Sequence, residues 1–189
     1  PFSRMKLQLS LMKDASAKKE LESDIDEMTA MLNSYMNFVK SETPDPIEEI
    51  NFHDLLREIC NSSKIKNKKI DLEINKEIKS SGRPLQLRRC FVNLIENAIR
   101  YSEKIIVELG VNDENIIINI SDNGPGIPQN KYDDVFKPFF TLDASRNKLK
   151  GESGLGLTIS RDIIRSHGGD ISLLKSSLGG LKVSVALPK

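Results

Sequence analysis

The feature that most limits the fold is a pair of apolar segments followed by a run rich in glycine and proline. Residues 105–111 and 115–120 are dominated by Ile, Val and Leu, and three polar residues, 112–114, separate them. This pattern predicts two strands paired through a short turn. The chain then enters the run DNGPG at residues 122–126, where glycine permits positive φ and close approach of the backbone to a ligand.

The segments around this strand pair occur in blocks and do not alternate regularly between strand and helix. Apolar residues at helical spacing cover residues 51–62, 84–99 and 155–166, and strand-like patterns cover residues 69–74, 170–174 and 181–187. We therefore predict an α+β fold in which helices cover one face of a mixed sheet.

The first 40 residues have a different pattern. Apolar residues recur at intervals of three and four over residues 2–12 and 21–39, which predicts two helices, each with a heptad-like apolar seam. We expect this hairpin to pair with a second copy in a four-helix bundle, because a lone hairpin leaves its seam half exposed. The alternative is that it packs on the rest of the chain. Two prolines within residues 41–46 indicate a linker, so we predict domains at 1–42 and 47–189.

The bulk composition is that of a soluble globular protein. The 28 basic and 27 acidic residues give a net charge of +1, which provides no global attraction for nucleic acid or an anionic membrane. Cys60 and Cys90 lie far apart without a CxxC pattern, which favours free thiols in a reducing compartment. No apolar run approaches the roughly 20 residues needed to span a bilayer.

Two asparagines are the first candidate binding residues. Asn93 and Asn97 are four residues apart, so they share one face of the predicted helix. Their amide oxygens are hard ligands of the kind that suits Mg²⁺ together with phosphate and water, and Arg100 lies near enough to meet a phosphate. Taken alone, the pair is weak evidence for a metal site, because solvated asparagines are common on helix surfaces.

A second candidate site follows the apolar strand. Asp122 ends that strand and is able to accept a hydrogen bond from an exocyclic amine such as that of adenine. Further along, GESGLG at residues 151–156 directly precedes a helix, and backbone N–H groups in such a turn bind phosphate. The basic segment between the two runs, which includes Arg146, is interpreted as a lid over the ligand. The alternative for the run at Asp122 is an ordinary turn at the end of a strand. The alternative for the basic segment is a solvated surface loop.

The order of these motifs resembles a known family. Asn-x-x-x-Asn, Asp-x-Gly-x-Gly, Phe-x-Pro-Phe and Gly-x-x-Gly-x-Gly-Leu are similar to the N, G1, F and G2 boxes of sensor histidine kinases, and the overall pattern is nearest the EnvZ-like group. These kinases belong to the superfamily of gyrase, heat-shock chaperone and mismatch-repair ATPases. The run SHGGDI at residues 166–171 also resembles the family. The resemblance implies a Bergerat α/β sandwich after the hairpin, with ATP and Mg²⁺ as cofactors.

The resemblance also implies individual roles. Asn97 would be the principal Mg²⁺ ligand, with Asn93 close by, and Asp122 would bind the adenine amine. Tyr101 would pack near the adenine, and Thr141 stands where many relatives have Arg, which leaves the lid contacts open. The full set of nucleotide-binding residues implied is Asn93, Asn97, Arg100, Tyr101, Asp122, Gly124, Gly126, Ile127, Phe136, Arg146, Gly154, Leu155 and Gly156.

In such kinases the γ-phosphoryl group of ATP passes to a histidine on the first helix of the bundle, within a His-[Asp/Glu]-x-Arg-Thr-Pro run. Residues 1–4, PFSR, look like the tail of that run, so the acceptor is expected upstream of Pro1 and no catalytic residue is expected in this sequence. His53 lacks the Thr-Pro, and His167 belongs to a Gly-Gly turn where a structural role is expected.

The resemblance thus implies a protein-histidine kinase whose phosphoryl group goes on to an Asp of a response-regulator receiver domain. The partners expected are a second copy of the chain and the receiver domain. We expect the cytoplasmic portion of an inner-membrane protein, with membrane contact only through segments outside this sequence. One alternative is an ATPase driven by nucleotide to change conformation, but its water-activating Glu would stand where Asn93 stands, and Asn is a poor base. Another is a non-catalytic dimerisation module.

Overall fold

The computed structural model describes residues 45–62, 69–74, 77–142 and 154–189, with six isolated helical positions before them. Those positions are Lys18, Leu21, Glu22, Ile25, Met28 and Thr29. The remainder of the helical hairpin predicted at 1–42, and the lid segment 143–153, lie outside the described residues.

A five-stranded sheet forms one layer of the domain, with strand order β2-β4-β5-β7-β6. Its strands are β2 (Lys69–Glu73), β4 (Lys104–Val111), β5 (Asn115–Asp122), β6 (Asp170–Lys175) and β7 (Leu181–Pro188). The pair β2 and β4 is parallel and the other three pairs are antiparallel. The predicted mixed sheet is therefore confirmed, including the pairing of β4 with β5 through the turn at 112–114.

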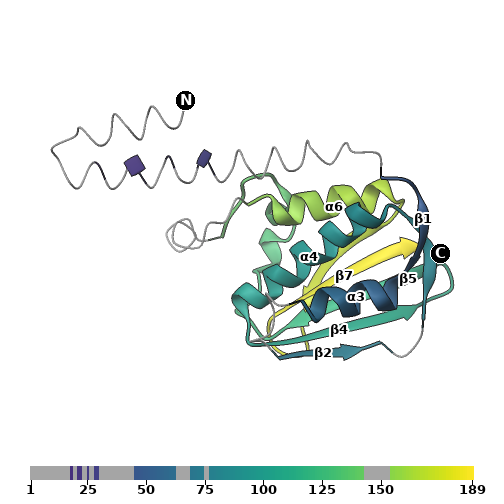
Figure 1. Ribbon diagram of the computed structural model, residues 1–189. Coiled ribbons are helices and arrows are strands. Elements are labelled where there is room, and N and C mark those ends of the chain that lie inside the picture. The colour runs from purple at the N-terminus through teal and green to yellow at the C-terminus, as the bar shows by residue number, and fades with distance from the viewer. Residues whose placement is uncertain are drawn as a thin grey trace.

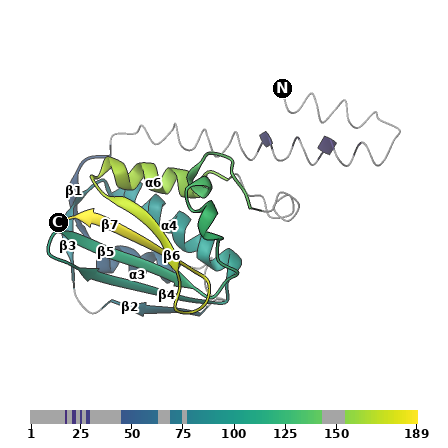
Figure 2. The ribbon, with the colours of Figure 1, turned by 180° about the vertical axis from the view of Figure 1, so that it is seen from behind.

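Three helices form the second layer. They are α3 (Phe52–Cys60), α4 (Pro84–Tyr101) and α6 (Gly156–Ser166), and all lie on one face of the sheet (Figure 1). Figure 2 views the sheet from the opposite face. This two-layer arrangement confirms the α+β fold predicted from the blocks of helix and strand, and α4 runs two residues beyond the predicted end at Ile99.

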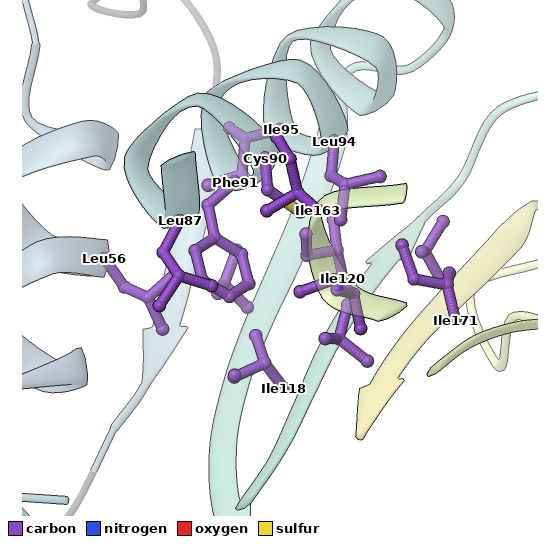
Figure 3. Close-up of a cluster of buried hydrophobic side chains, with 14 of the residues drawn as sticks. Leu56, Leu87, Cys90, Phe91, Leu94, Ile95, Ile118, Ile120, Ile163 and Ile171 are labelled. Atoms are coloured by element: carbon purple, nitrogen blue, oxygen red, sulfur yellow. The ribbon is translucent and has the colours of Figure 1, made fainter. Parts of the chain in front are cut away.

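The core lies between the two layers. Alternate residues of β4 and β5 are almost fully buried against the helices. Figure 3 shows Ile118 and Ile120 of β5 near the apolar face of α4. Phe52 of α3 and Phe91 of α4 meet edge to face with ring centroids 6.3 Å apart. Because the chain has no Trp, branched aliphatic side chains fill most of this space.

Helices α4 and α6 are joined by a reciprocal polar contact inside the core. The Cys90 thiol lies 3.7 Å from the Ser160 carbonyl oxygen, and the Ser160 hydroxyl donates to the Cys90 carbonyl at 3.4 Å. Both side chains are fully buried, and burial raises the pKa of the Cys90 thiol to about 12. Both cysteines are free, as predicted.

Four short elements were not predicted from the sequence. β1 (Glu48–Asn51) and β3 (Lys79–Gly82) form a separate antiparallel pair, and η3 (Gln129–Lys131) and η4 (Asp134–Phe136) are 3₁₀ turns. β3 reads KSSG and buries only its glycine, so it lacks the apolar alternation that marks a strand. Single 3₁₀ turns have no period long enough to detect.

The start of α4 is fixed by side chains from two other segments. Its N-cap residue, Arg83, provides no capping side chain. Instead the Asp45 carboxylate accepts from the N–H groups of Leu85 at 3.4 Å and Gln86 at 2.9 Å. The Arg83 N–H donates to His167 Nε2 at 3.0 Å. The first N–H groups of a helix have no acceptor within the helix. Asp45 and His167 provide acceptors for the N–H groups at the start of α4.

Within the described ranges, no helix combines the length and the apolar character that crossing a bilayer requires.

Candidate functional site

Asp122 is the most enclosed charged residue at the predicted site. It ends β5, is 6% exposed, and accepts hydrogen bonds at Oδ1 from the N–H groups of Gly124 at 2.8 Å and Leu181 at 3.1 Å. Neither bond uses Oδ2. Burial raises the pKa of Asp122, and the two N–H bonds partly offset that rise. The carboxylate is therefore held in a fixed orientation with one oxygen available to a ligand.

Glycines surround this carboxylate because side chains would not fit. A Cβ at Gly124 would lie 2.8 Å from the Tyr101 carbonyl oxygen, and a Cβ at Gly180 would overlap Asp122 Oδ1. Gly126 has φ of 69°, a left-handed conformation that L side chains rarely adopt. The turn after β5 thus packs tightly against both the end of α4 and the turn before β7.

The four predicted residues of α4 lie in its C-terminal half. Asn93 and Asn97 are one turn apart and half-buried, Arg100 is exposed, and Tyr101 is 39% exposed as the last residue of the helix. The contact between Gly124 and the Tyr101 carbonyl places this end of the helix against the Asp122 turn. The two motifs, about 25 residues apart in the sequence, are therefore brought together.

Ile127 and Phe136 follow that turn in the sequence and are partly buried against the core. α6 holds the segment around Phe136 in two ways. The Thr158 hydroxyl donates to the Phe136 carbonyl at 2.9 Å, and the Arg161 guanidinium lies over the Phe136 ring, 4.3 Å from its centroid. These contacts fix the segment that precedes the predicted lid to the helix that follows the lid.

The two ends of the lid segment lie side by side. The Phe139 N–H donates to the Gly154 carbonyl at 3.1 Å, and a Cβ at Gly154 would lie 2.8 Å from the Phe139 backbone. Both residues have φ of 63°, a strained value for the aromatic residue. Phe139 and Gly154, which lie on either side of the predicted lid in the sequence, are therefore held together by their backbones.

The N-terminus of α6 completes the described site. Leu155 is its N-cap residue, is 8% exposed and makes no side-chain capping bond. Gly156 is the first helical residue, and a Cβ there would meet nothing within 4 Å. The N-cap side chain therefore leaves the first N–H groups of α6 without a capping bond. Arg146 and Gly151 lie outside the described residues.

The amide pair on α4 fits a magnesium ion that is shared with a ligand. Among the described residues, no group of three or more His, Cys, Asp or Glu is placed to hold a metal. Asn93 and Asn97 supply neutral oxygen donors on one helix face, and an ion held there would take its other ligands from phosphate and water.

Neither histidine lies in the arrangement expected of a phosphoryl acceptor on a bundle helix. His53 belongs to the first turn of α3, where its Nδ1 lies 3.0 Å from Asp54 Oδ1. His167 follows α6, with Nδ1 2.7 Å from the Ile163 carbonyl oxygen and Nε2 accepting from Arg83. Since that carbonyl only accepts, His167 carries its proton on Nδ1. These contacts support the structural role predicted for it.

Sequence reasoning missed three contributors to the site. Gly180 closes against Asp122, and the Gly-Gly pair at 179–180 before the last strand was the available signal. Thr158 holds the backbone at Phe136, which no local pattern indicates because the partners are 22 residues apart. Asn123 is the third, and its side chain bonds to the segment after α4.

Comparison with known proteins agrees with this geometry. Residues 82–189 match the family described as histidine kinase-, DNA gyrase B-, and HSP90-like ATPase. The whole chain is 30% identical to the sensor histidine kinase GtrS of Pseudomonas aeruginosa and 28% identical to the sensor histidine kinase CpxA of Escherichia coli K12. It spans 39% and 44% of those two proteins.

The catalytic domain of histidine kinase ThkA is a similar solved structure, with a TM-score of 0.67 and 27% identity. The match covers 76% of this chain and 96% of that one. The chain therefore belongs to the histidine kinase-, DNA gyrase B- and HSP90-like ATPase family, and it contains a catalytic domain of the sensor histidine kinase type.

Proposed function

We propose that this domain binds ATP with Mg²⁺ and donates the γ-phosphoryl group to a histidine, from which the group passes to an Asp of a response regulator. The observation that carries the proposal is the Asp122 carboxylate, buried and held at Oδ1 by two backbone N–H groups. A fixed acceptor in a glycine-lined turn suits the exocyclic amine of adenine.

The phosphate side of the site is proposed at the N-terminus of α6. The N-cap residue makes no side-chain capping bond, and the N–H groups of the first turn carry partial positive charge, which favours an anion there. Asn97, with Asn93 beside it, is proposed to hold Mg²⁺, and Arg100 to meet phosphate. Magnesium, when bound, neutralises charge on the phosphates during transfer.

The remaining predicted residues position the ligand. Tyr101 and Ile127 are proposed to flank the base, and Phe136 with Leu155 to support the two ends of the lid. Arg146 is proposed to contact phosphate from the lid, as the resemblance implies. Catalysis then rests on alignment and charge neutralisation, because phosphoryl transfer needs little covalent chemistry from the protein.

The acceptor histidine and the partners are part of the same proposal. Since His53 and His167 are engaged within the domain, the acceptor is proposed to be a histidine outside this sequence, on a helix of a homodimeric bundle to which residues 1–42 contribute. GtrS and CpxA are sensor kinases, so we propose that the chain works in two-component signalling, in the cytoplasmic part of a membrane protein. A hydrolytic ATPase is not favoured, because position 93 carries an amide where a water-activating carboxylate would stand.

Incubation with ATP labelled at the γ-phosphate tests this assignment. The chain alone is expected to bind nucleotide, to remain unlabelled and to release little free phosphate. Acid-labile label on His53 or His167 would contradict the proposed acceptor, and steady phosphate release would favour the ATPase alternative.

A further inference from the structure

Asn123 is an exposed residue whose side chain bonds to a distant segment. Its Oδ1 accepts hydrogen bonds from the N–H groups of Glu103 at 3.1 Å and Lys104 at 2.9 Å. Its own N–H donates to the Lys104 carbonyl at 3.2 Å. Three hydrogen bonds therefore join the residue next to Asp122 to Glu103 and to Lys104, the first residue of β4.

These partners follow directly after the end of α4. The helix ends at Tyr101, and its C-cap residue Ser102 is buried, with its hydroxyl donating to the Ala98 carbonyl at 2.7 Å. Ala98 is the neighbour of Asn97. Ser102 thus ties the last turn of α4, which carries the proposed magnesium ligand, to Glu103 and Lys104. Asn123 ties that same segment to the adenine-binding turn.

On its other side the turn lies close to the end of α4 at Gly124. A Cβ at Gly124 would already lie 2.8 Å from the Tyr101 carbonyl oxygen. Contact at Gly124 limits how closely the turn and α4 approach, and the Asn123 bonds limit how far they separate. The distance between the proposed adenine and metal subsites is therefore set at this junction.

We propose that Asn123 is a positioning residue that holds the adenine-binding carboxylate of Asp122 in register with the amides of Asn93 and Asn97. It contacts neither base nor metal. It determines whether one nucleotide can bind Asp122 through its adenine and the magnesium site through its phosphates at the same time. It therefore sets how strongly Mg²⁺ and nucleotide reinforce each other's binding. This inference rests on the function proposed above.

The chain contains a matched control in Asn112. Its Oδ1 also accepts two backbone N–H groups, from Glu114 at 3.1 Å and Asn115 at 2.7 Å, and the residue is also exposed. It closes the β4–β5 turn, at the opposite end of these strands from Asp122. A substitution there removes the same kind of bonds away from the site.

The test is calorimetric titration with ADP in the presence of Mg²⁺ and in the presence of a chelator. The measured quantity is the factor by which Mg²⁺ tightens ADP binding. Asn123→Leu is expected to reduce that factor by roughly three- to tenfold, because the two side-chain hydrogen bonds that hold the register are lost. Asn123→Asp, which keeps the acceptor oxygen, is expected to restore most of it.

Asn112→Leu is expected to lower the melting temperature about as much as Asn123→Leu while leaving the Mg²⁺ factor unchanged. Amide hydrogen exchange at Glu103 and Lys104, measured without ligand, is expected to accelerate in Asn123→Leu only. If Asn123→Leu does not melt cooperatively, Asn123→Ala carries the same expectation.

The inference is overturned if Asn123→Leu weakens ADP binding equally with and without Mg²⁺, or if Asn112→Leu changes the Mg²⁺ factor as much. Absence of ADP binding to the unsubstituted chain would instead overturn the proposed function, so the two failures are distinguishable.

Discussion

At the scale of single residues, Asp122 combines burial with a fixed set of partners. Its carboxylate accepts at Oδ1 from Gly124 and Leu181, and burial raises its pKa above the ordinary 3.8. The charged form is therefore disfavoured in the folded state relative to the unfolded chain. A buried carboxylate of this kind lowers the stability of the fold at neutral pH. Such a cost is typical of a residue whose charge binds a ligand.

Asp122→Asn is expected to separate these two effects. The amide oxygen still accepts from both N–H groups, but an NH₂ group replaces Oδ2 and opposes the amine of adenine. ADP affinity is expected to fall by about 10- to 100-fold, which corresponds to the roughly 1.5–3 kcal/mol of a hydrogen bond to a charged group. Calorimetric titration measures the loss.

The pH dependence of unfolding has a defined sign for the same substitution. Because the folded-state pKa of Asp122 is raised, its contribution to stability is greatest below pH 3.8 and declines as pH rises from 3.8 through the folded-state value. Asp122→Asn lacks this decline, so its free energy of unfolding relative to the unsubstituted chain is expected to increase across that window. Urea unfolding at several pH values checks it, and a relative decrease would contradict the assigned cause.

At the scale of elements, α4 connects the linker side of the domain to the site. Its first turn is capped by Asp45 and bonded through Arg83 to His167, and its C-terminal half carries the two proposed magnesium ligands. Asp45 lies within the segment predicted to be a linker. Through Asp45, the end of that linker therefore contacts α4 of the ATP-binding domain.

Asp45→Ala is expected to lower the free energy of unfolding by about 1 kcal/mol, the usual effect of losing a helix cap. Urea denaturation followed by circular dichroism measures the change. Asp113→Ala, at the exposed turn between β4 and β5, serves as the control and is expected to have an effect below about 0.5 kcal/mol. Equal effects of the two substitutions would show that the contact with α4 does not stabilise the helix.

Local pattern explains which elements were predicted. β4 and β5 alternate buried and exposed residues along their length, so periodicity identifies them. β1 and β3 pair with each other over residues that are mostly polar and exposed. Neither strand therefore has an apolar alternation by which the sequence could have predicted it. The helix and strand framework follows from the sequence, whereas contacts between distant segments, such as Asp45 with α4 or Asn123 with Glu103, require the structure.

At the scale of the whole molecule, two turns and two helix ends that are distant in sequence meet at one edge of the sandwich. The Asp122 turn contacts the end of α4 on one side and the turn before β7 on the other, and α6 holds the segment around Phe136. The motif residues were predicted from their resemblance to a family. Two of the residues that hold Asp122 in place were not predicted. Gly180, which packs against it, and Leu181, whose N–H donates to it, lie 58 and 59 positions further along the chain.

A nuclear magnetic resonance titration with Mg²⁺ and a non-hydrolysable ATP analogue tests the central claim most directly, since it reports where the nucleotide binds. The account predicts that the largest amide shift changes fall on Asp122, Gly124 and Gly126, on Asn93 and Asn97, and at the start of α6. It also predicts that the changes near the two asparagines shrink when Mg²⁺ is omitted. Saturable binding with shifts centred elsewhere, or no binding at all, would contradict it.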